Sequence, residues 1–261
     1  MNVIVSLKQV PGTTKVEIDP ETNTLIRQGI ENIVNPFDTY ALEEGVRLKE
    51  RYGGRVTAIS TGPPQAEAVL REALATGADE AILLSDTAFA GADTWVTAYT
   101  LTKTVEKLGQ YDIVICGRQT IDGDTGQVGP ELAEILGVTF VAYVSQIEEI
   151  DNGRMRLRRL MGERYEVVEA LLPAVITVVK EINVPRLPSL RGLTRAKGAV
   201  IPVWNAEDLG VDESKVGLAG SATRVIKIFF PQRAQRGEVL GGDLASQVDY
   251  VVDKLRGAKL I

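Results

Sequence analysis

The segment of this chain best suited to ligand chemistry is a glycine-rich stretch at residues 117–130, which reads GRQTIDGDTGQVGP. It follows an apolar run at 111–116 and precedes a helix-like run at 131–136, so it predicts a loop between a buried strand and a helix. Backbone N–H groups at the start of a helix favour phosphate, and glycines let a ligand approach the backbone closely. We therefore expect this loop to bind a nucleotide or dinucleotide, with the backbone exposed at Gly117, Gly123, Gly126 and Gly129.

The spacing of these glycines matches neither the P-loop nor the usual dinucleotide fingerprint, so a plain surface turn remains an alternative. Asp122 and Asp124 argue against phosphate contacts by their own side chains, because like charges repel. We expect these carboxylates to orient the loop or to accept hydrogen bonds from hydroxyl groups. Arg118 is either a phosphate contact or an exposed charge at the strand end, and Gln127 either binds the ligand or caps the following helix.

The amino-acid composition excludes most other kinds of catalytic and metal site. The 261 residues contain no histidine and one cysteine, which excludes Ser-His-Asp and Cys-His catalysis, most zinc sites and any intrachain disulfide. We expect Cys116 to be a small buried side chain and any redox chemistry to need a bound cofactor, so no catalytic residue and no metal ligand is predicted. The net charge of −6 provides no general attraction to nucleic acid.

The ends and the apolar runs of the chain indicate where the protein is found. The run at 171–179 is too short to cross a bilayer, and the N-terminus leads directly into a strand without the features of a signal peptide. A single cysteine fits a reducing compartment. These features predict a cytoplasmic protein without direct insertion into a membrane.

Strand-like and helix-like segments alternate along most of the chain. This alternation predicts an α/β fold with a doubly wound, mostly parallel sheet of the Rossmann-like, adenine-nucleotide-binding kind. The expected strands are 2–7, 56–60, 81–84, 113–116 and 174–179, and the expected helices are 36–51, 65–76, 93–108 and the segment ending near 136. A hairpin is expected from 16–18 and 24–26 around Asp19-Pro20, and an antiparallel addition at 140–170 with a turn at 151–153.

Polar residues follow several of these strands, at the edge of a parallel sheet where ligands bind. Ser6 and Thr61 follow two strands, and Asn35 is placed to cap the helix that starts at Pro36. Tyr40 is expected to pack in the core. The candidate cofactor-binding residues are Ser6, Asn35, Pro36, Phe37, Asp38, Thr61, Gly117, Arg118, Gln119, Thr120, Gly123, Asp124, Thr125, Gly126, Gln127 and Val128.

Two further segments suggest contacts with other proteins. Residues 182–206 contain no acidic residue, and the stretch 184–192 carries prolines and leucines beside arginines. It is either an irregular connection with solvated charges or an interface with Leu190 as its apolar anchor. After a linker at 231–242, apolar residues repeat at helical spacing from 244 to 255, which predicts an amphipathic helix that docks on its own domain or on a partner.

A series of motifs in the chain resembles the β subunit of the electron transfer flavoproteins. The matching segments are VSLKQV at 5–10, VNPFD at 34–38, ALEEGVRLK at 41–49, GPP at 62–64, ALATGAD at 73–79 and the loop at 117–130. The resemblance extends through about residue 230 and more loosely to the C-terminus. It implies a nucleotide- or flavin-binding domain at 1–230, and a linker and helix at 231–261 that dock on an α subunit.

The resemblance also implies a function. In this family the α subunit holds one FAD, and the β subunit holds AMP in ordinary members or a second FAD in electron-bifurcating members. That second flavin takes a hydride from NADH. One electron then passes to ferredoxin or flavodoxin, and the other passes through the α-subunit FAD to a partner dehydrogenase of the acyl-CoA type. A loop of the β subunit recognises the dehydrogenase, and Leu190 and Arg191 fall in it.

The loop sequence favours the bifurcating branch. Ordinary members carry an acidic residue where this chain has Gly123, and the run from Asp122 to Pro130 is similar to the bifurcating pattern apart from Gly126, where Ala is common. A glycine at 123 leaves room and N–H groups for a second phosphate, so FAD is expected, with AMP as the alternative. Two other proteins remain to be considered. A stand-alone ATP-binding regulatory protein would lack the 184–192 loop, and an adenylating enzyme would need a pyrophosphate loop that residues 8–12 do not supply.

Overall fold

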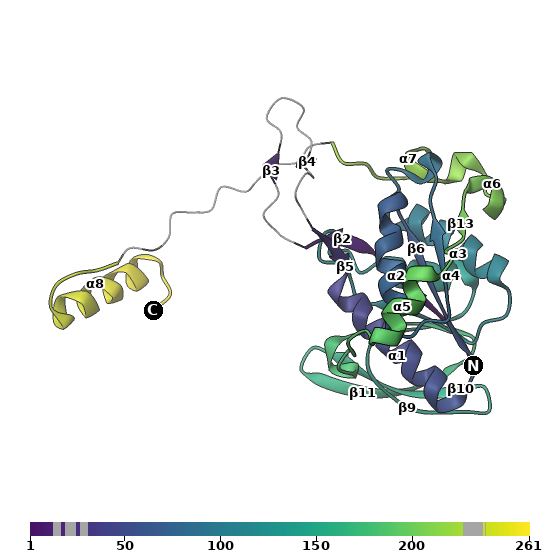
Figure 1. Ribbon diagram of the computed structural model, residues 1–261. Helices are drawn as coiled ribbons and strands as arrows, with labels where there is room; N and C mark the ends of the chain where they lie inside the picture. Colours follow the sequence, from purple (N-terminus) through teal and green to yellow (C-terminus); the bar gives the residue numbers. More distant parts are fainter. Residues whose placement is uncertain (13–16, 19–24, 27–30, 227–236, 238) are drawn as a thin grey trace. The chain divides into compact units, whose positions relative to one another are not determined.

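The computed structural model describes the chain except for residues 13–16, 19–24, 27–30, 227–236 and 238 (Figure 1). It divides into two compact units, Met1–Arg224 and Val225–Ile261. The domain boundary expected at residue 230 lies outside the described residues. No helix in the described part of the chain is long and apolar enough to cross a membrane.

The first unit is built on a large mixed sheet. Its strand order is β11-β10-β9-β12-β8-β1-β6-β7-β13 in the part of the chain that the structure describes. The central strands are parallel, as predicted, and they are β1 (Asn2–Ser6), β6 (Arg55–Thr61), β7 (Glu80–Leu84), β8 (Ile113–Gly117), β12 (Ala174–Val178) and β13 (Val203–Trp204).

The strand order reverses at β1. The chain passes from β1 outward through β6 and β7, and then returns to the other side of β1 to form β8. A sheet of this kind has its ligand site outside the carboxyl ends of the strands at the reversal. The loops that follow β1 and β8 are therefore the expected place for a ligand site.

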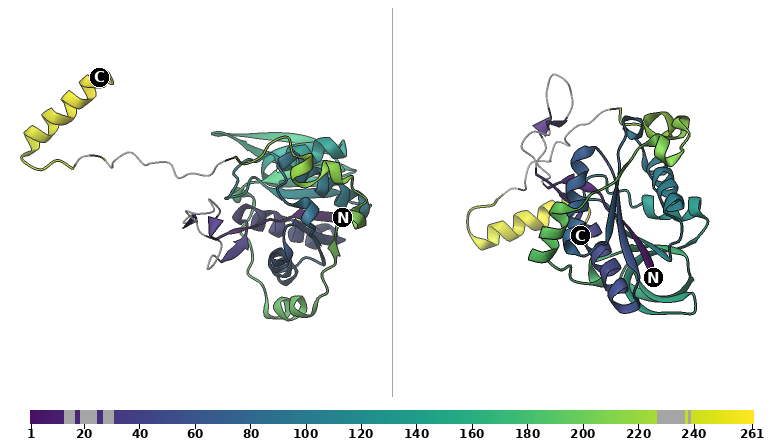
Figure 2. Two further views of the ribbon diagram at one scale, coloured as in Figure 1. Left: turned by 90° about the horizontal axis from the view of Figure 1, so that it is seen from above. Right: turned by 45° about the vertical axis from the view of Figure 1, so that its right-hand side comes forward.

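Helices cover both faces of the parallel strands (Figure 2). One face packs against α1 (Pro36–Tyr52), α2 (Glu67–Thr76) and α5 (Leu190–Gly198), and the other against α3 (Thr94–Leu108), α4 (Val128–Leu136), α6 (Ala206–Leu209) and α7 (Gly217–Gly220). Short 3₁₀ turns occur at η1 (Pro64–Ala66), η2 (Thr87–Phe89), η3 (Lys180–Ile182) and η4 (Glu213–Lys215).

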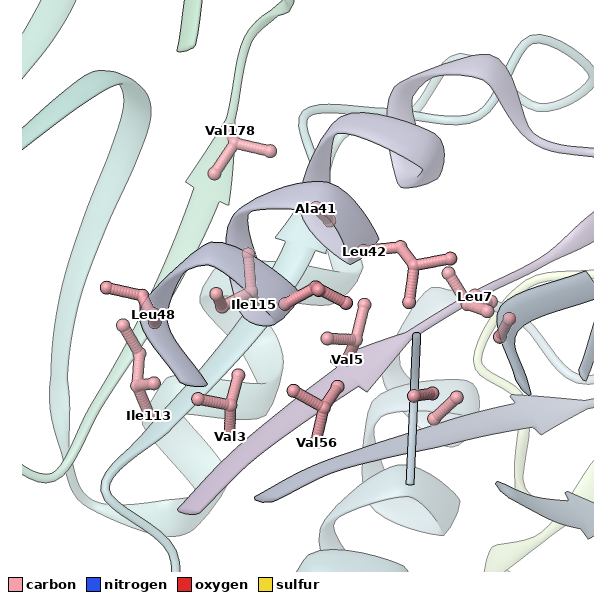
Figure 3. Close-up of a cluster of buried hydrophobic side chains, with 14 of the residues drawn as sticks. Val3, Val5, Leu7, Ala41, Leu42, Leu48, Val56, Ile113, Ile115 and Val178 are labelled. Atoms are coloured by element: carbon pink, nitrogen blue, oxygen red, sulfur yellow. The ribbon is translucent and has the colours of Figure 1, made fainter. Parts of the chain in front are cut away.

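Alternation along the buried strands divides the core into two clusters. Val3 and Val5 of β1 face α1, together with Ile113 and Ile115 of β8 (Figure 3). Ile4, between the two valines, belongs to the cluster on the opposite face. Successive side chains of a strand point to opposite faces, so strands covered on both sides need continuous apolar runs. This requirement explains why the first strand was recognisable in the sequence.

The antiparallel addition at one edge of the sheet confirms the prediction. It consists of β9 (Thr139–Asp151), β10 (Arg154–Met161) and β11 (Arg164–Leu171), and β9 also pairs in parallel with β12. The predicted turn is present, with Asn152 at φ 47° and Gly153 at φ 74°. A two-residue hairpin turn needs this left-handed backbone, which Asn and Gly adopt most readily.

Outside the large sheet, the described residues form two short strand pairs and a C-terminal helix. β2 (Gln9–Pro11) pairs with β5 (Asn32–Val34), and β3 (Glu17–Ile18) pairs antiparallel with β4 (Leu25–Ile26) in the expected hairpin, whose turn at Asp19-Pro20 lies outside the described residues. The second unit contains α8 (Leu244–Gly257), which confirms the helical spacing seen in the sequence.

The segment 184–192 differs from the expected irregular loop, because helix α5 begins within it at Leu190. The Ser189 hydroxyl accepts a hydrogen bond from the backbone N–H of Gly192 at 3.0 Å and caps the helix. A Cβ at Gly192 would lie 2.0 Å from the carbonyl oxygen of Ala75, so this glycine lets α5 approach α2 closely (Figure 1). Glycine weakens helix propensity, and tertiary packing outweighs it here.

Candidate nucleotide-binding rim

The loops after β1, β6 and β8 and the first turn of α1 form a rim at the carboxyl edge of the parallel strands. The register places Ser6, the last residue of β1, beside Ile59 of β6 and Cys116 of β8, so the three strands end together. The structure thus brings together the strand-end residues that the sequence predicted separately.

The glycines of the 117–130 loop serve different purposes. A Cβ at Gly117 would lie 2.3 Å from Asp38 Oδ1, and one at Gly129 would lie 2.4 Å from Thr177 Cγ2. These two glycines therefore allow protein segments to pack closely, and their exposure to a ligand stays a prediction. Gly126 has φ +63°, a conformation that favours glycine.

Gly123 is the open position of the loop. Within 4 Å, the only atom of the described residues that its Cβ would meet is Thr120 Oγ1, at 3.6 Å. The residues around it, from Ile121 to Thr125, are exposed. A ligand is thus free to approach the backbone at Gly123, as the sequence predicted.

Asn35 does not cap α1, contrary to the prediction, and instead connects α1 to the glycine loop. Its side-chain Nδ2 donates to Asp38 Oδ1 and to the carbonyl oxygen of Gln119, both at 2.9 Å, and its Oδ1 accepts from the N–H of Ile121 at 3.2 Å. The side chain is fully buried. Pro36 at the first helical position has no N–H to satisfy, so the helix start needs this cap less.

Asp38 lies buried beneath the rim. Its Oδ2 accepts from the N–H of Lys8 at 2.7 Å, and its carboxylate also accepts from the N–H of Gly117. Burial removes the carboxylate from water and raises its pKa to about 7, although hydrogen bonds from Asn35, Lys8 and Gly117 and the charge of Lys8 act in the other direction.

Pairs within the rim confirm that the loop carboxylates orient it. Lys8 Nζ lies 2.7 Å from Asp122 Oδ2, and Gln119 Nε2 donates to Asp124 Oδ1. Burial opposes ionisation of Asp122, but hydrogen bonds from Lys8 and Thr120 outweigh it and lower the pKa. Asp124 has φ 54°, in the left-handed region that Asp tolerates.

Two hydroxyl groups at the end of β6 stand out. Ser60 Oγ and Thr61 Oγ1 are buried and have no hydrogen-bond partner among the described residues. Buried polar groups are normally paired, so these atoms fit a rim that a polar ligand completes. Thr61 was a predicted site residue, whereas Ser60 was missed because nothing in the sequence distinguishes it from other strand-end serines.

Tyr143 is a second residue that the sequence did not identify. It has φ 59° where the pairing of β9 with β12 shifts register, and the Arg118 guanidinium lies 5.4 Å from the centre of its ring. Its N–H donates to Thr177 Oγ1 at 3.2 Å. A bulge of this kind redirects a side chain, and here it directs an aromatic ring towards an exposed arginine of the loop.

The remaining predicted site residues differ in their exposure and contacts. Phe37 is half-buried and Thr125 is exposed. Gln127 does not cap α4, and its Oε1 accepts a hydrogen bond from Thr94 Oγ1 at 3.3 Å. Val128 begins α4 and packs against the core cluster on that face of the sheet. Tyr40 packs against the cluster between α1 and the sheet, as predicted.

The predicted partner segment lies away from the rim. Gly192 rests on Ala75 at the end of α2 that leads into β7, so the start of α5 is near the amino ends of the strands. Leu190 is 86% exposed, and Arg191 is exposed as well. Arg195 is not a free charge, since its guanidinium donates to the carbonyl oxygens of Leu74 and Ala78 near the end of α2.

Arg186 fixes the segment before α5. Its guanidinium donates to both carboxylate oxygens of Glu43 at 2.8 and 3.0 Å, and to both of Glu50 at 2.6 and 2.9 Å. The hydrogen bonds that Arg186 donates to Glu50 and Glu43 raise its pKa further above the usual range. The planar, bidentate contacts of Arg186 therefore hold the segment that carries the exposed leucines against α1.

The rim offers binding groups but no redox group of its own. Cys116 is buried, as predicted, and burial and then the charge of Asp38 raise the pKa of its thiol to about 12. No cluster of His, Cys, Asp and Glu in the described ranges could hold a metal ion. What this arrangement can do is bind and orient a polar ligand such as a nucleotide.

Comparison with known proteins identifies the family. The electron transfer flavoprotein domain matches residues 22–209. The chain is 48% identical over 262 residues to the electron transfer flavoprotein subunit beta of Thermoanaerobacterium thermosaccharolyticum, with 100% of both chains covered. It is 44% identical over 263 residues to the caffeyl-CoA reductase-Etf complex subunit CarD of Acetobacterium woodii, again with 100% of both covered. It is 42% identical over 248 residues to protein FixA of Azotobacter vinelandii, covering 92% of this chain and 88% of that protein.

These findings define a class of electron-transfer proteins. The chain belongs to the electron transfer flavoprotein family, and its relatives place it with the beta subunits. The family resemblance seen in the sequence is thereby confirmed, while the branch of the family is a separate question.

Proposed function

We propose that this chain is the β subunit of a heterodimeric, electron-bifurcating electron transfer flavoprotein, and that its rim binds FAD. The observation that carries the proposal is the open position at Gly123, where the nearest atom to a Cβ would be 3.6 Å away. The rim would hold the adenylate of FAD, and the exposed residues from Ile121 to Thr125 would hold its second phosphate.

The residues present fit such a ligand. The orphaned hydroxyls of Ser60 and Thr61 supply hydrogen bonds to the adenylate, and Arg118, held against Tyr143, supplies positive charge to a phosphate. Asp38 acts from beneath the rim rather than by touching the cofactor, because its carboxylate is buried and already accepts three protein donors. The glycine loop begins α4, whose N-terminus favours negative charge.

The bound flavin would supply the redox chemistry, accepting a hydride from NADH and releasing its electrons one at a time. The protein side chains bind and orient the adenylate end and keep the loop in place. Cys116 takes no part because its thiol is buried and protonated.

The alternative ligand is AMP, in an ordinary member of the family. The observation that favours it is the pair of carboxylates beside Gly123, since Asp122 and Asp124 oppose a second phosphate at this place. Lys8 offsets one of these charges through its ion pair with Asp122. Family membership favours either ligand over the stand-alone ATP-binding protein and the adenylating enzyme considered from the sequence.

The proposed partners are those of the family, and exposed residues at the start of α5 support one of them. An α subunit carrying its own FAD binds the C-terminal arm at 231–261, and ferredoxin or flavodoxin takes the low-potential electron in the cytoplasm. A dehydrogenase of the acyl-CoA type contacts Leu190 and Arg191, which are exposed at the start of α5. The name of the CarD relative, from a caffeyl-CoA reductase complex, supports a partner that acts on a CoA thioester.

The decisive experiment is to determine the nucleotides of the co-expressed αβ heterodimer. The protein is purified gently, denatured, and its extract separated by chromatography with FAD and AMP standards. Two FAD per heterodimer support the proposal. One FAD and one AMP would identify an ordinary member, and NADH should then fail to bleach the flavin absorbance.

A further inference from the structure

Two buried side chains at the start of α1 connect the loops that follow β1 and β8. Asn35 and Asp38 hydrogen-bond to each other at 2.9 Å and hold groups from two other segments. Asp38 accepts from Lys8 at the end of β1 and from Gly117 at the end of β8, and Asn35 holds the carbonyl of Gln119 and the N–H of Ile121. The partners of Asn35 on the loop are 84 and 86 residues away in the sequence.

The Asp38 carboxylate is the acceptor in each of its hydrogen bonds. The backbone N–H of Lys8, the backbone N–H of Gly117 and the Asn35 amide are all donors, and the carboxylate is the acceptor of each. Only a group with acceptor capacity on both oxygens satisfies all three. A protonated carboxyl or an amide at this position would place a donor against a donor, and one hydrogen bond would be lost.

We propose that Asn35 and Asp38 are a positioning pair, which keeps the glycine loop in its ligand-binding conformation before the nucleotide arrives and does so only while Asp38 is ionised. The inference rests on the proposed function in that the ligand is a nucleotide. It goes further because it makes the affinity of the rim depend on two residues beneath it rather than on ligand contacts. A loop fixed in advance binds more tightly because less ordering is needed on binding.

The sign of the pH dependence follows from the geometry. Burial raises the pKa of Asp38 to about 7, so the carboxylate takes up a proton as the pH falls through that value and loses one acceptor position. Lys8 at the end of β1 and Cys116 on β8 are the titratable groups that act on it electrostatically, and Asp122 on the loop is paired with Lys8. Cys116 stays neutral over this range, because burial raises the pKa of its thiol to about 12. Nucleotide affinity should therefore fall as the pH is lowered from about 8.5 to about 6.

The test uses the αβ heterodimer with Asp38→Asn, which mimics the protonated form, and Asn35→Ser. Thr39→Val is the matched control, because Thr39 lies in the same turn and its side-chain hydroxyl donates to the carbonyl oxygen of Pro36, at 2.7 Å, and not to the loop. Amide hydrogen exchange of residues 117–126 is measured without nucleotide, and the affinities for FAD and for AMP are measured by titration from about pH 6 to about pH 8.5.

Both variants should accelerate exchange in the loop and weaken binding roughly tenfold, which corresponds to about 1.4 kcal/mol, with exchange in β1 and in residues Ile113–Cys116 of β8 unchanged. The affinity of the wild type and of Thr39→Val should fall towards low pH, and that of Asp38→Asn should be flat. Loop exchange equal to that of the wild type in both variants would overturn the inference, as would a wild-type pH profile that Asp38→Asn retains. Failure of the wild type to bind either nucleotide would refute the proposed function instead, and the exchange measurement would still decide the role of the pair.

Discussion

Gly123→Asp isolates the contribution of the open loop position to cofactor binding. The backbone at 123 is outside the left-handed region, and a Cβ there meets only Thr120 Oγ1 at an ordinary contact distance of 3.6 Å. The fold should accept the new side chain, with the free energy of unfolding within about 0.5 kcal/mol of the wild type. Any change in nucleotide affinity then reports on the ligand rather than on folding.

The magnitude follows from the charge that the substitution adds. A carboxylate about 6 Å from a phosphate is repelled by about 1–3 kcal/mol at an effective dielectric constant of about 20–50. This repulsion weakens FAD binding by a factor of about 5 to 150. AMP, which has no second phosphate over the loop, should be affected less.

Titration of FAD and AMP into the nucleotide-free αβ heterodimer measures the effect. Gly123→Asn is the matched control, since it has the same shape without the charge, and Gly123→Ala tests for steric effects alone. The loss with Asp should shrink as salt is raised, because salt screens exposed charges. If Asp and Asn weaken FAD equally, the charge argument fails. If neither changes the affinity, the second phosphate does not lie at this loop.

Three further substitutions test the surfaces and the packing described above. Leu190→Ala should leave the melting temperature unchanged because the side chain is 86% exposed, and should weaken dehydrogenase binding about thirtyfold, or about 2 kcal/mol; a lower melting temperature with normal binding would show that the residue supports the fold. Arg186→Met leaves the Glu43 carboxylate buried without its partner and should lower the free energy of unfolding by about 3 kcal/mol in urea titrations. The additional substitution Glu43→Gln should recover much of the lost free energy of unfolding, and a double variant as unstable as Arg186→Met alone would refute the ion-pair argument. Gly129→Ala should cost about 1–3 kcal/mol, since its Cβ would lie 2.4 Å from Thr177 Cγ2; stability equal to the wild type would mean that α4 and β12 move apart easily.

Much of the fold was predictable because it depends on local patterns. The continuous apolar run at 2–7 indicated a strand covered on both faces, and β1 has that environment, with Val3 and Ile4 in opposite clusters. The turn at Asn152-Gly153 was predicted by residue types that adopt the required backbone. Helix α5 was missed because Gly192 and the nearby prolines oppose a helix locally, and its packing on α2 is not visible in the sequence.

The location of the candidate site was also predictable, because every segment of the rim follows a recognisable strand or begins a recognisable helix. The roles of its residues were not. Gly117 and Gly123 have the same residue type in the same loop, yet one packs against Asp38 and the other is open. Which role each takes depends on atoms of α1 that are far away along the chain.

The sequence by itself thus determined the family, the alternation of strands and helices, and the position of the glycine loop between a strand and a helix, since each is encoded in neighbouring residues. Only the tertiary structure decided that Asn35 bridges to Gln119, that Arg186 pairs with Glu43, and that the Ser60 hydroxyl has no hydrogen-bond partner in the described part of the chain. The physical reason is that hydrogen bonds and ion pairs act over a few ångströms in space. Residues that are many positions apart acquire their roles only when the sheet brings them together.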